Sequence, residues 1–560
     1  MNFIKKIFSI LNLIDKKNYF KIQLLFLLLI ISLILESLSI TLILPILAFF
    51  FSESSMNLGF LNYFLNLNDS LIYALVFFTF VITFKNLFNI FLGYFRTKFT
   101  FQTQIDISKK IFENILSTNY NFFISQSSAS YIRNIFQEPN NFATGFINPL
   151  LIIVSEMFLV IGILIIISLV EPILFIYLIL LSGVILLIFF KLIKNKIRVL
   201  GKSRQNAEFK RLREVNNAFD SYQVTKIFNL ENFYISNYDE HSKKVLKAGV
   251  INETVANIPR FFLELLMIVL IILIIIYLKF FLKLGNDETL IILSLYGYAA
   301  FRIFPSINRI MVNIQNVQFS FSTFDLICKL VSENIPSNDN KKLITDFENS
   351  LEFKNIKFSY EQSKMIHSFN FYIKKNSITG ILGPSGSGKT TLLNIISGLL
   401  QFQSGEVAID GKNINLDENS LMGLYSYVPQ SNLLIDGSVT DNIALGQSDT
   451  KINFKKINQI IDKLRLRELI KDLPQGLETN LGKNGSKISG GQAQRVCIAR
   501  ALYYDRKIII LDEPTSALDK KNENEFLNYL NDLKNIVTII IVSHKDKSFK
   551  ICDQIINIEN

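Results

Sequence analysis

Six long apolar stretches follow one another in the first part of the chain, with polar or basic stretches between most of them. They cover residues 20–51, 71–95, 146–170, 172–190, 258–281 and 289–314. Each reaches or approaches the roughly 20 residues that a helix needs to cross about 30 Å of hydrocarbon. Because backbone groups in lipid must pair within their own segment, we predict six transmembrane helices.

The chain changes character after the sixth stretch. Two long polar connections, 96–144 and 191–257, are expected to continue the spans as helices beyond the bilayer. Further on, short buried strands alternate with helical patterns, which is typical of a soluble α/β domain. We therefore expect a polytopic α-helical membrane domain at 1–335, a polar linker at 336–350 and an α/β domain at 351–560.

The composition supports a membrane protein. Hydrophobic residues make up 50% of the chain and charged residues 19%, against about 25% charged in ordinary soluble domains. These values exclude a disordered or collagen-like chain and argue against a fully soluble enzyme. Three cysteines in 560 residues indicate a reducing compartment without a disulfide framework.

The formal net charge of +11 is explained by topology. The N-terminus and the connections 96–144 and 191–257 are rich in Lys and Arg, whereas 52–70 contains neither. Basic loops stay on the cytoplasmic side. We therefore expect a multi-pass protein of the cytoplasmic membrane, with both termini and the α/β domain in the cytoplasm and no nucleic-acid partner. Residues 4–14 are predicted to form an amphipathic helix in the interface.

A glycine-rich loop in the α/β domain indicates nucleotide binding. It follows a predicted strand, opens a helix and matches the pattern GxxxxGK[ST], whose backbone N–H groups bind phosphates. Its lysine would neutralise the β- and γ-phosphates of ATP, and its threonine hydroxyl would reach Mg²⁺. The expected ATP ligands here are Gly383, Pro384, Ser385, Gly386, Ser387, Gly388, Lys389, Thr390 and Thr391.

Two further strand ends carry candidate catalytic groups. The apolar run 508–511 leads into Asp512 and Glu513. Asp512 is expected to bind Mg²⁺, and Glu513 to orient or deprotonate the attacking water. His544 ends another predicted strand, at the sheet edge where ligands of open α/β sheets bind, and is expected to contact the γ-phosphate.

A sequence between these motifs, Ser489-Gly490-Gly491-Gln492, opens another predicted helix. It resembles the signature of the nucleotide-binding domain of ATP-binding-cassette (ABC) transporters, with Ile488 where leucine is usual. The resemblance implies further roles: adenine stacking for Tyr360, a link from Mg²⁺ to the membrane domain for Gln430, and coupling of two sites for residues 516–519.

The resemblance also implies an exporter-type half-transporter. In this family ATP lies between the phosphate loop of one copy and the signature helix of another, so the chain must pair with a second half-transporter. Both sites look intact, which favours a homodimer. One departure is Lys483, which stands where the family usually has an acid and affects the expected coupling to the cytoplasmic loops.

The substrate is suggested by charged residues within the spans, which mark functional sites by default. Arg302 and Arg309 are seven residues apart and share a helix face, and with Lys85 they could offer positive charge to an anionic head group. Interfacial snorkelling is the alternative. Arg260 is a third candidate contact, or it simply pairs with Glu264 four residues on.

The stretches 252–264 and 301–310 are similar to parts of the bacterial flippase of lipid-linked oligosaccharides. This similarity, with an apolar outer helix expected within 58–65, implies an amphipathic polyprenyl-diphosphate oligosaccharide as substrate. ABC exporters of drugs, lipids or peptides remain alternatives. An ATP-gated membrane regulator that does not transport is a further alternative. Replacement of Glu513 or His544 by another residue would favour it, and both residues are present.

Overall fold

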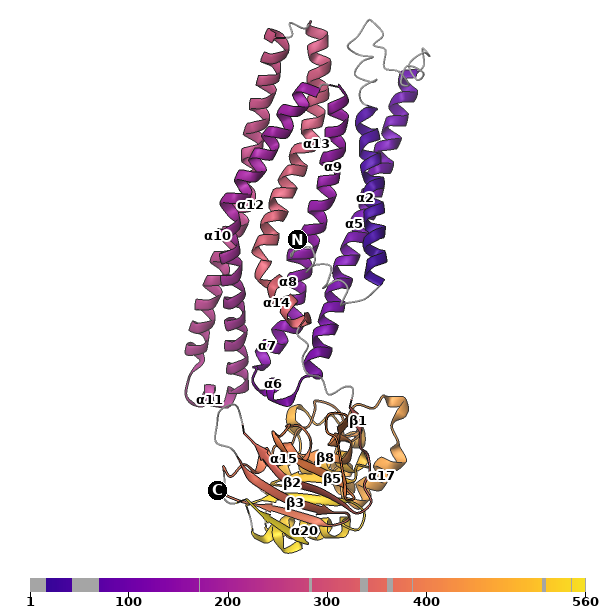
Figure 1. The fold of residues 1–560 in the computed structure, drawn as a ribbon, viewed down its shortest axis with the longest axis vertical. Helices are drawn as coiled ribbons and strands as arrows, with labels where there is room; N and C mark the ends of the chain where they lie inside the picture. The colour runs from indigo at the N-terminus through magenta and orange to yellow at the C-terminus, as the bar shows by residue number, and fades with distance from the viewer. Residues whose placement is uncertain are drawn as a thin grey trace. The chain divides into compact units, whose positions relative to one another are not determined.

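The computed structural model describes residues 17–42, 70–170, 172–281, 285–332, 341–359, 366–384, 386–515, 520–544 and 546–558. The chain divides into two compact units (Figure 1). The first comprises 1–116 and 125–335, and the second comprises 117–124 and 336–560. The interfacial helix expected at 4–14 and the outer helix expected within 58–65 lie outside the described residues.

Six long helices form the first unit, and each overlaps one of the predicted apolar stretches. They are α2 (Lys17–Thr41), α5 (Ser70–Leu116), α9 (Asn148–Val170), α10 (Pro172–Asp220), α12 (Glu231–Ile276) and α13 (Asn286–Phe319). Within the described residues, four segments are long and apolar enough to cross a membrane: Phe20–Ser39, Leu75–Leu116, Ser128–Ile165 and Glu231–Phe280. A transmembrane helical domain is confirmed, while the count of six spans stays a prediction.

Three of these helices are much longer than a bilayer is thick. Helices α5, α10 and α12 have 47, 49 and 46 residues, which at 1.5 Å per residue gives about 70 Å. The long connections are thus helical, as expected. The other helical elements described in the first unit are α7 (Ser128–Ile132), η2 (Arg133–Gln137), α8 (Glu138–Phe142), η3 (Ala143–Ile147), α11 (Tyr222–Ile227), η4 (Tyr277–Phe281) and α14 (Phe321–Ser332), whereas α6 (Tyr120–Ile124) belongs to the second unit.

The helices of the first unit pack in a chain of neighbours. Helix α2 contacts α5 and α9, α9 contacts α13, and α10 contacts both α12 and α13. Stacked rings of Phe142, Phe146 and Phe324 fill one core, with Phe146 and Phe324 centroids 4.7 Å apart. At Gly201 on α10, an added Cβ would lie 1.9 Å from the carbonyl oxygen of Phe319. The close approach of α10 to the end of α13 therefore requires glycine.

Two larger sheets and one short strand pair form the second unit. The parallel sheet has the order β11–β4–β10–β9–β8, and the antiparallel sheet β3–β2–β5–β6, while β1 pairs with β7. The bounds are β1 (Lys342–Leu343), β2 (Ser350–Phe358), β3 (Ile366–Lys374), β4 (Ile378–Leu382), β5 (Ser404–Ile409), β6 (Lys412–Asn413), β7 (Asn419–Ser420), β8 (Tyr425–Val428), β9 (Ile508–Asp512), β10 (Thr538–Ser543) and β11 (Gln554–Asn557).

Helices cover the parallel sheet. They are α15 (Lys389–Ile396), α16 (Val439–Ile443), α17 (Phe454–Lys463), α18 (Arg467–Asp472), α19 (Gly490–Tyr503) and α20 (Lys520–Leu533), with 3-10 turns η5 (Leu421–Leu424), η6 (Asp449–Lys451), η7 (Gly476–Glu478), η8 (Lys483–Gly485) and η9 (Asp546–Ile551). Strands β9 and β10 are buried along their whole length. Alternate residues of each strand join two different apolar clusters, because successive side chains point to opposite faces of a sheet. The predicted α/β domain is thereby built around a central strand pair.

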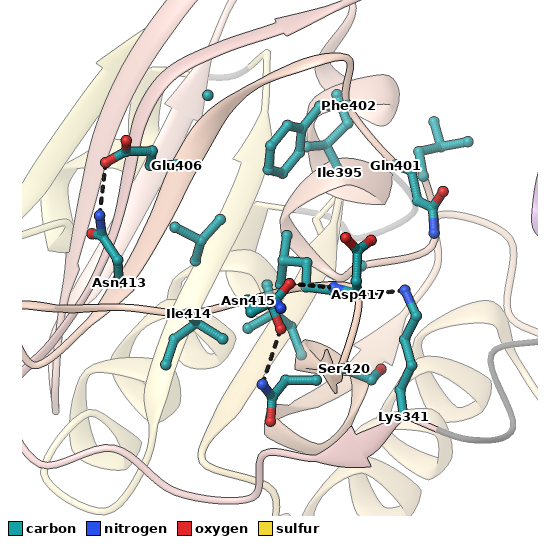
Figure 2. A pocket seen from close by; sticks show the side chains of 17 residues that line it. Lys341, Ile395, Gln401, Phe402, Glu406, Asn413, Ile414, Asn415, Asp417 and Ser420 are labelled. Carbon is teal, nitrogen blue, oxygen red and sulfur yellow. Dashed lines mark hydrogen bonds between the residues drawn. The ribbon is translucent and has the colours of Figure 1, made fainter.

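The expected linker is only partly a linker. From Lys341 onward it belongs structurally to the second unit: it forms β1, and Phe347 is 2% exposed in the core. Figure 2 shows Lys341 at a cavity of about 340 Å³ behind β5 and β6. Its Nζ donates to the carbonyl oxygen of Leu416 at 2.7 Å. An apolar side chain within the polar stretch anchors this segment, which the polar composition alone did not indicate.

Candidate functional site: a phosphate loop and two strand ends

The glycine-rich loop connects β4 to α15, as the motif predicts. Gly386 and Gly388 have φ of 84° and 90°, in the left-handed region that side chains rarely adopt. Gly388 is the N-cap of α15. At Gly383 an added Cβ would lie 2.5 Å from Ser387 Oγ. Glycine is therefore needed for the loop to wind tightly around the start of the helix; Ser385 lies outside the described residues.

The polar groups of this loop fit a bound phosphate. Lys389 is only 9% exposed, and its Nζ donates to the carbonyl oxygens of Gly383 and Pro384 at 2.8 and 3.0 Å. Ser387 Oγ is buried and has no hydrogen-bond partner among the residues that the structure describes, whereas Thr390 is exposed. An ammonium group, an unsatisfied hydroxyl and helix N–H groups converge here, which is the donor set that phosphate oxygens require.

Asp512 ends β9 and is held by a neighbouring strand. Tyr427 on β8 donates a hydrogen bond from its hydroxyl to Asp512 Oδ2 at 3.1 Å. Burial raises the pKa of Asp512, and the negative charge of Glu513 adds to this, while the Tyr427 hydrogen bond and the charge of Lys389 oppose it. Burial and the nearby Asp512 charge in turn raise the pKa of Tyr427, so that the phenol remains a donor. A carboxylate in this setting, with Thr390 in the first turn of α15, suits a hard cation such as Mg²⁺.

The three predicted catalytic side chains lie together. Glu513 Oε2 accepts a hydrogen bond from Gln430 Nε2 at 2.8 Å, and Glu513 Oε1 lies 3.2 Å from His544 Nδ1. The backbone of Glu513 has φ of 48°, and its N–H donates to the carbonyl oxygen of Val542 at 2.9 Å. A non-glycine residue held in the left-handed region is typical of functional sites, where surrounding contacts offset the strain.

The signature residues form a separate helix start. The Ser489 side chain accepts from the Gln492 N–H at 3.3 Å, and the Gln492 side chain accepts from the Ser489 N–H at 2.8 Å. This reciprocal pair caps α19 and leaves Gly490 and Gly491 at its first turn. Each of these two side chains therefore accepts a hydrogen bond from the backbone N–H of the other residue.

Sequence reasoning missed two side chains near these motifs. Tyr427 has no role in the sequence-based predictions, although its hydroxyl reaches Asp512. Asn432 donates from Nδ2 to the carbonyl oxygen of Gly490 at 3.0 Å, which ties the segment after Gln430 to the signature helix. Residues 516–519 and Tyr360 lie outside the described residues, and Lys483 is exposed on η8.

The candidate basic residues within the predicted spans each have a carboxylate partner. Lys85 is completely buried, with Nζ 3.2 Å from Glu36 Oε2. It therefore does not contact a substrate directly in this structure, and its part in a positively charged cavity stays a prediction. Arg302 Nε lies 3.3 Å from the other oxygen of Glu36.

The other two arginines are more exposed. Arg309 Nε lies 2.9 Å from Glu156 Oε1, and the Arg309 side chain is 54% exposed. Arg260 pairs with Glu264 at 3.1 Å, as the four-residue spacing indicated, and both side chains are exposed. Arg302 and Arg309 thus keep accessible surface, each with a carboxylate as counter-ion.

Comparison with known proteins agrees with this geometry. The family models "ABC transporter" and "ABC transporter transmembrane region" match residues 366–516 and 20–296. The ATP-dependent lipid A-core flippases of Ralstonia nicotianae and Coxiella burnetii are each 25% identical, over 83% and 86% of this chain and 79% and 81% of theirs. A probable ABC transporter ATP-binding/permease protein of Haemophilus influenzae is 36% identical over 38% of each chain.

A solved structure shares the fold. The structure of a bacterial Atm1-family ABC exporter with ATP bound has a TM-score of 0.81, with 18% identity, over 97% of this chain and 94% of that one. The two family matches cover both units in the order that an exporter half requires. This chain belongs to the ABC transporters and is an exporter-type half-transporter, in which a membrane-spanning helical domain is followed by an ATPase domain that couples ATP hydrolysis to transport.

Proposed function

We propose that two copies of this chain form a homodimer that flips an anionic, amphipathic lipid across the cytoplasmic membrane. A polyprenyl-diphosphate oligosaccharide is the leading substrate. Both termini and the ATPase domain lie in the cytoplasm, as the distribution of Lys and Arg favours. The observation that carries the proposal is that Arg302 and Arg309, seven residues apart on α13, both keep accessible surface within a membrane helix.

Each ATP lies on the phosphate loop of one copy. Lys389 exchanges its two carbonyl contacts for the β- and γ-phosphates, Ser387 Oγ gains the partner it lacks, and Tyr360 stacks on the adenine. The N–H groups at 386–391 provide the remaining donors. The same loop therefore neutralises charge and fixes the orientation of the γ-phosphate.

Thr390, Asp512 and Gln430 would hold Mg²⁺. The bound cation would supply charge neutralisation at the β- and γ-oxygens. Tyr427 keeps one Asp512 oxygen occupied and so directs the other toward the loop. Gln430 bonds Glu513 at 2.8 Å here, so it senses the catalytic carboxylate and, by the family resemblance, the membrane domain.

Glu513 orients and activates the attacking water, while His544 fixes Glu513 and contacts the γ-phosphate. The signature residues 489–492 of the second copy complete the site with a serine hydroxyl and helix N–H groups. Because these donors come from the other chain, ATP binds the closed dimer more tightly than the open one and shifts the population toward closure. Hydrolysis removes the bridging contact and allows the domains to part.

The cargo assignment rests on charge and on similarity. The relatives from Ralstonia and Coxiella are named for a lipid cargo. In this chain the exposed arginines suit a phosphate-bearing head group, because guanidinium binds phosphate oxygens with two parallel hydrogen bonds. Exporters of drugs or peptides have less need of such a cationic pair within the spans.

Reconstituted protein tests the proposal. Proteoliposomes containing a fluorescent polyprenyl-diphosphate saccharide are given ATP, and the fraction of label that is accessible from outside is followed with time. Glu513→Gln, which retains the side-chain shape, serves as the control without hydrolysis. We expect movement that needs both ATP and Glu513. Hydrolysis without movement would contradict the cargo assignment and leave drugs, other lipids and peptides to be tested.

A further inference from the structure

A buried ion-pair triad joins three membrane helices of the first unit. Glu36 on α2 is 3% exposed and lies between Lys85 on α5, which is fully buried, and Arg302 on α13. Lys85 Nζ also donates to Ser39 Oγ at 3.3 Å. One carboxylate is thus shared by two cations, and the group of three carries a formal charge of +1, from two positive charges and one negative.

The three members differ in how far they reach the surface. The side chains of Lys85 and Glu36 are 0% and 4% exposed, whereas that of Arg302 is 32% exposed. Lys85 and Glu36 therefore cannot touch a ligand directly. Only the arginine can, and it is the outermost member of the triad.

The contact with Arg302 leaves much of the guanidinium available. Glu36 Oε1 faces Arg302 Nε at 3.3 Å, and neither atom has a hydrogen-bond partner among the described residues. A guanidinium has five N–H donors in a fixed plane. The ion pair at Nε keeps the guanidinium beside Glu36, and no hydrogen bond from its terminal nitrogens is seen among the described residues, which leaves these donors for another anion.

A buried pair of this kind is weak evidence for a stabilising role. Taking two charges out of water often costs as much as their attraction returns, and apolar replacements of such pairs are frequently neutral. Charged residues inside membrane helices are rare and are associated with function. Lys85 and Glu36 are thus better explained by what they do for the third member than by holding α2 against α5.

We propose that Glu36 and Lys85 are positioning residues for the head-group site: Lys85 holds the Glu36 carboxylate in place, and Glu36 orients the Arg302 guanidinium toward the phosphate groups of the lipid. The inference rests on the proposed function. It adds that head-group affinity depends on two residues that never touch the lipid. Glu156 holds Arg309 through Nε in the same way, seven residues further along α13.

The test uses the full-length chain in phosphatidylcholine proteoliposomes with increasing undecaprenyl diphosphate. The mole fraction of lipid that gives half-maximal stimulation of ATPase activity is measured together with the maximal rate. The double variant Glu36→Leu/Lys85→Leu removes one negative and one positive charge, so the summed formal charge at the triad positions, Arg302 included, stays +1. A change in affinity then reports on orientation and not on net charge.

We expect the double variant to raise the half-stimulating mole fraction about tenfold, the scale on which loss of an orienting partner acts, and to lower the maximal rate less. The matched control is Lys109→Gln/Glu113→Gln, which removes an exposed pair from the same helix α5. This control should respond like the unchanged protein. An unchanged half-stimulating fraction in the Leu/Leu variant would overturn the inference, because the pair would then only join two helices.

A second variant covers the case in which the double variant does not fold. Glu36→Gln keeps the side-chain shape and raises the local formal charge to +2. Simple electrostatics predicts tighter binding of the anionic lipid, whereas loss of orientation predicts weaker binding. Tighter binding would overturn the inference. If undecaprenyl diphosphate and phosphatidic acid both fail to stimulate the unchanged protein, the proposed function fails and this inference with it.

Discussion

The hydrogen bond from Tyr427 to Asp512 offers a direct test of the proposed cation site. Tyr427→Phe removes one hydroxyl and leaves the ring on β8 in place. A hydrogen bond to a charged group contributes about 1.5–3 kcal/mol. Tyr427 is 41% exposed, so water replaces part of this interaction and we expect about 1 kcal/mol. At about 1.4 kcal/mol per factor of ten, this corresponds to about a fivefold loss.

Loss of this hydrogen bond should weaken the binding of Mg²⁺ more than it slows hydrolysis. We expect the Mg²⁺ concentration that gives half-maximal ATP hydrolysis to rise about fivefold, with a smaller fall in the maximal rate, because Asp512 is no longer held but is still present. The assay is ATP hydrolysis at saturating ATP over a Mg²⁺ titration. Tyr372→Phe is the matched control, since Tyr372 is also 41% exposed and lies on the antiparallel strand β3. An unchanged Mg²⁺ requirement in Tyr427→Phe would refute the reasoning.

Three further outcomes follow from single contacts. His544→Ala should reduce the rate of ATP hydrolysis about a hundredfold while nucleotide binding is retained. If the variant and the unchanged protein hydrolysed ATP at the same rate, the role proposed for His544 would be wrong. Gly201→Ala should lower the free energy of unfolding, followed by thermal unfolding, by about 1–3 kcal/mol, because the added methyl group clashes with the Phe319 carbonyl. Gly249→Ala should leave it unchanged, because a Cβ at Gly249 meets no atom within 4 Å. The side chain of Asn442 is fully buried and hydrogen-bonds to four other residues. Asn442→Ala should therefore lower the free energy of unfolding by about 2 kcal/mol. Asn458→Ala, at a partly exposed position, is the control for Asn442→Ala. If chemical unfolding showed the same loss of unfolding free energy in both variants, burial of Asn442 would not explain its effect.

Much of the architecture could be predicted because strong local rules decide it. Long apolar stretches have one stable form in lipid, and the glycine pattern 383–390 has one winding that avoids clashes. The apolar stretches predicted the long helices of the first unit, and the glycine pattern predicted the loop between β4 and α15. The buried runs of β9 and β10 were equally clear, since a parallel strand covered on both faces is apolar at every position.

Other features depend on contacts between distant residues, for which a single sequence holds no signal. Nothing near Lys85 indicates that Glu36, 49 positions earlier, is its partner. The hydrogen bond between Tyr427 and Asp512 joins residues 85 positions apart through adjacent strands. Phe347 is a third case: it lies in a polar stretch, yet its side chain is buried in the apolar core of the second unit and fixes that segment there.

The second unit is discontinuous in sequence. Residues 117–124 lie between the membrane helices α5 and α7, yet they belong to the same compact unit as 336–560, and Tyr120 packs against its apolar core. The polypeptide therefore passes between the two units at three points rather than one. A fragment beginning at Pro336 would lack a piece of its own surface. Limited proteolysis at the linker alone would therefore release 336–560 without the contact that Tyr120 makes with its core.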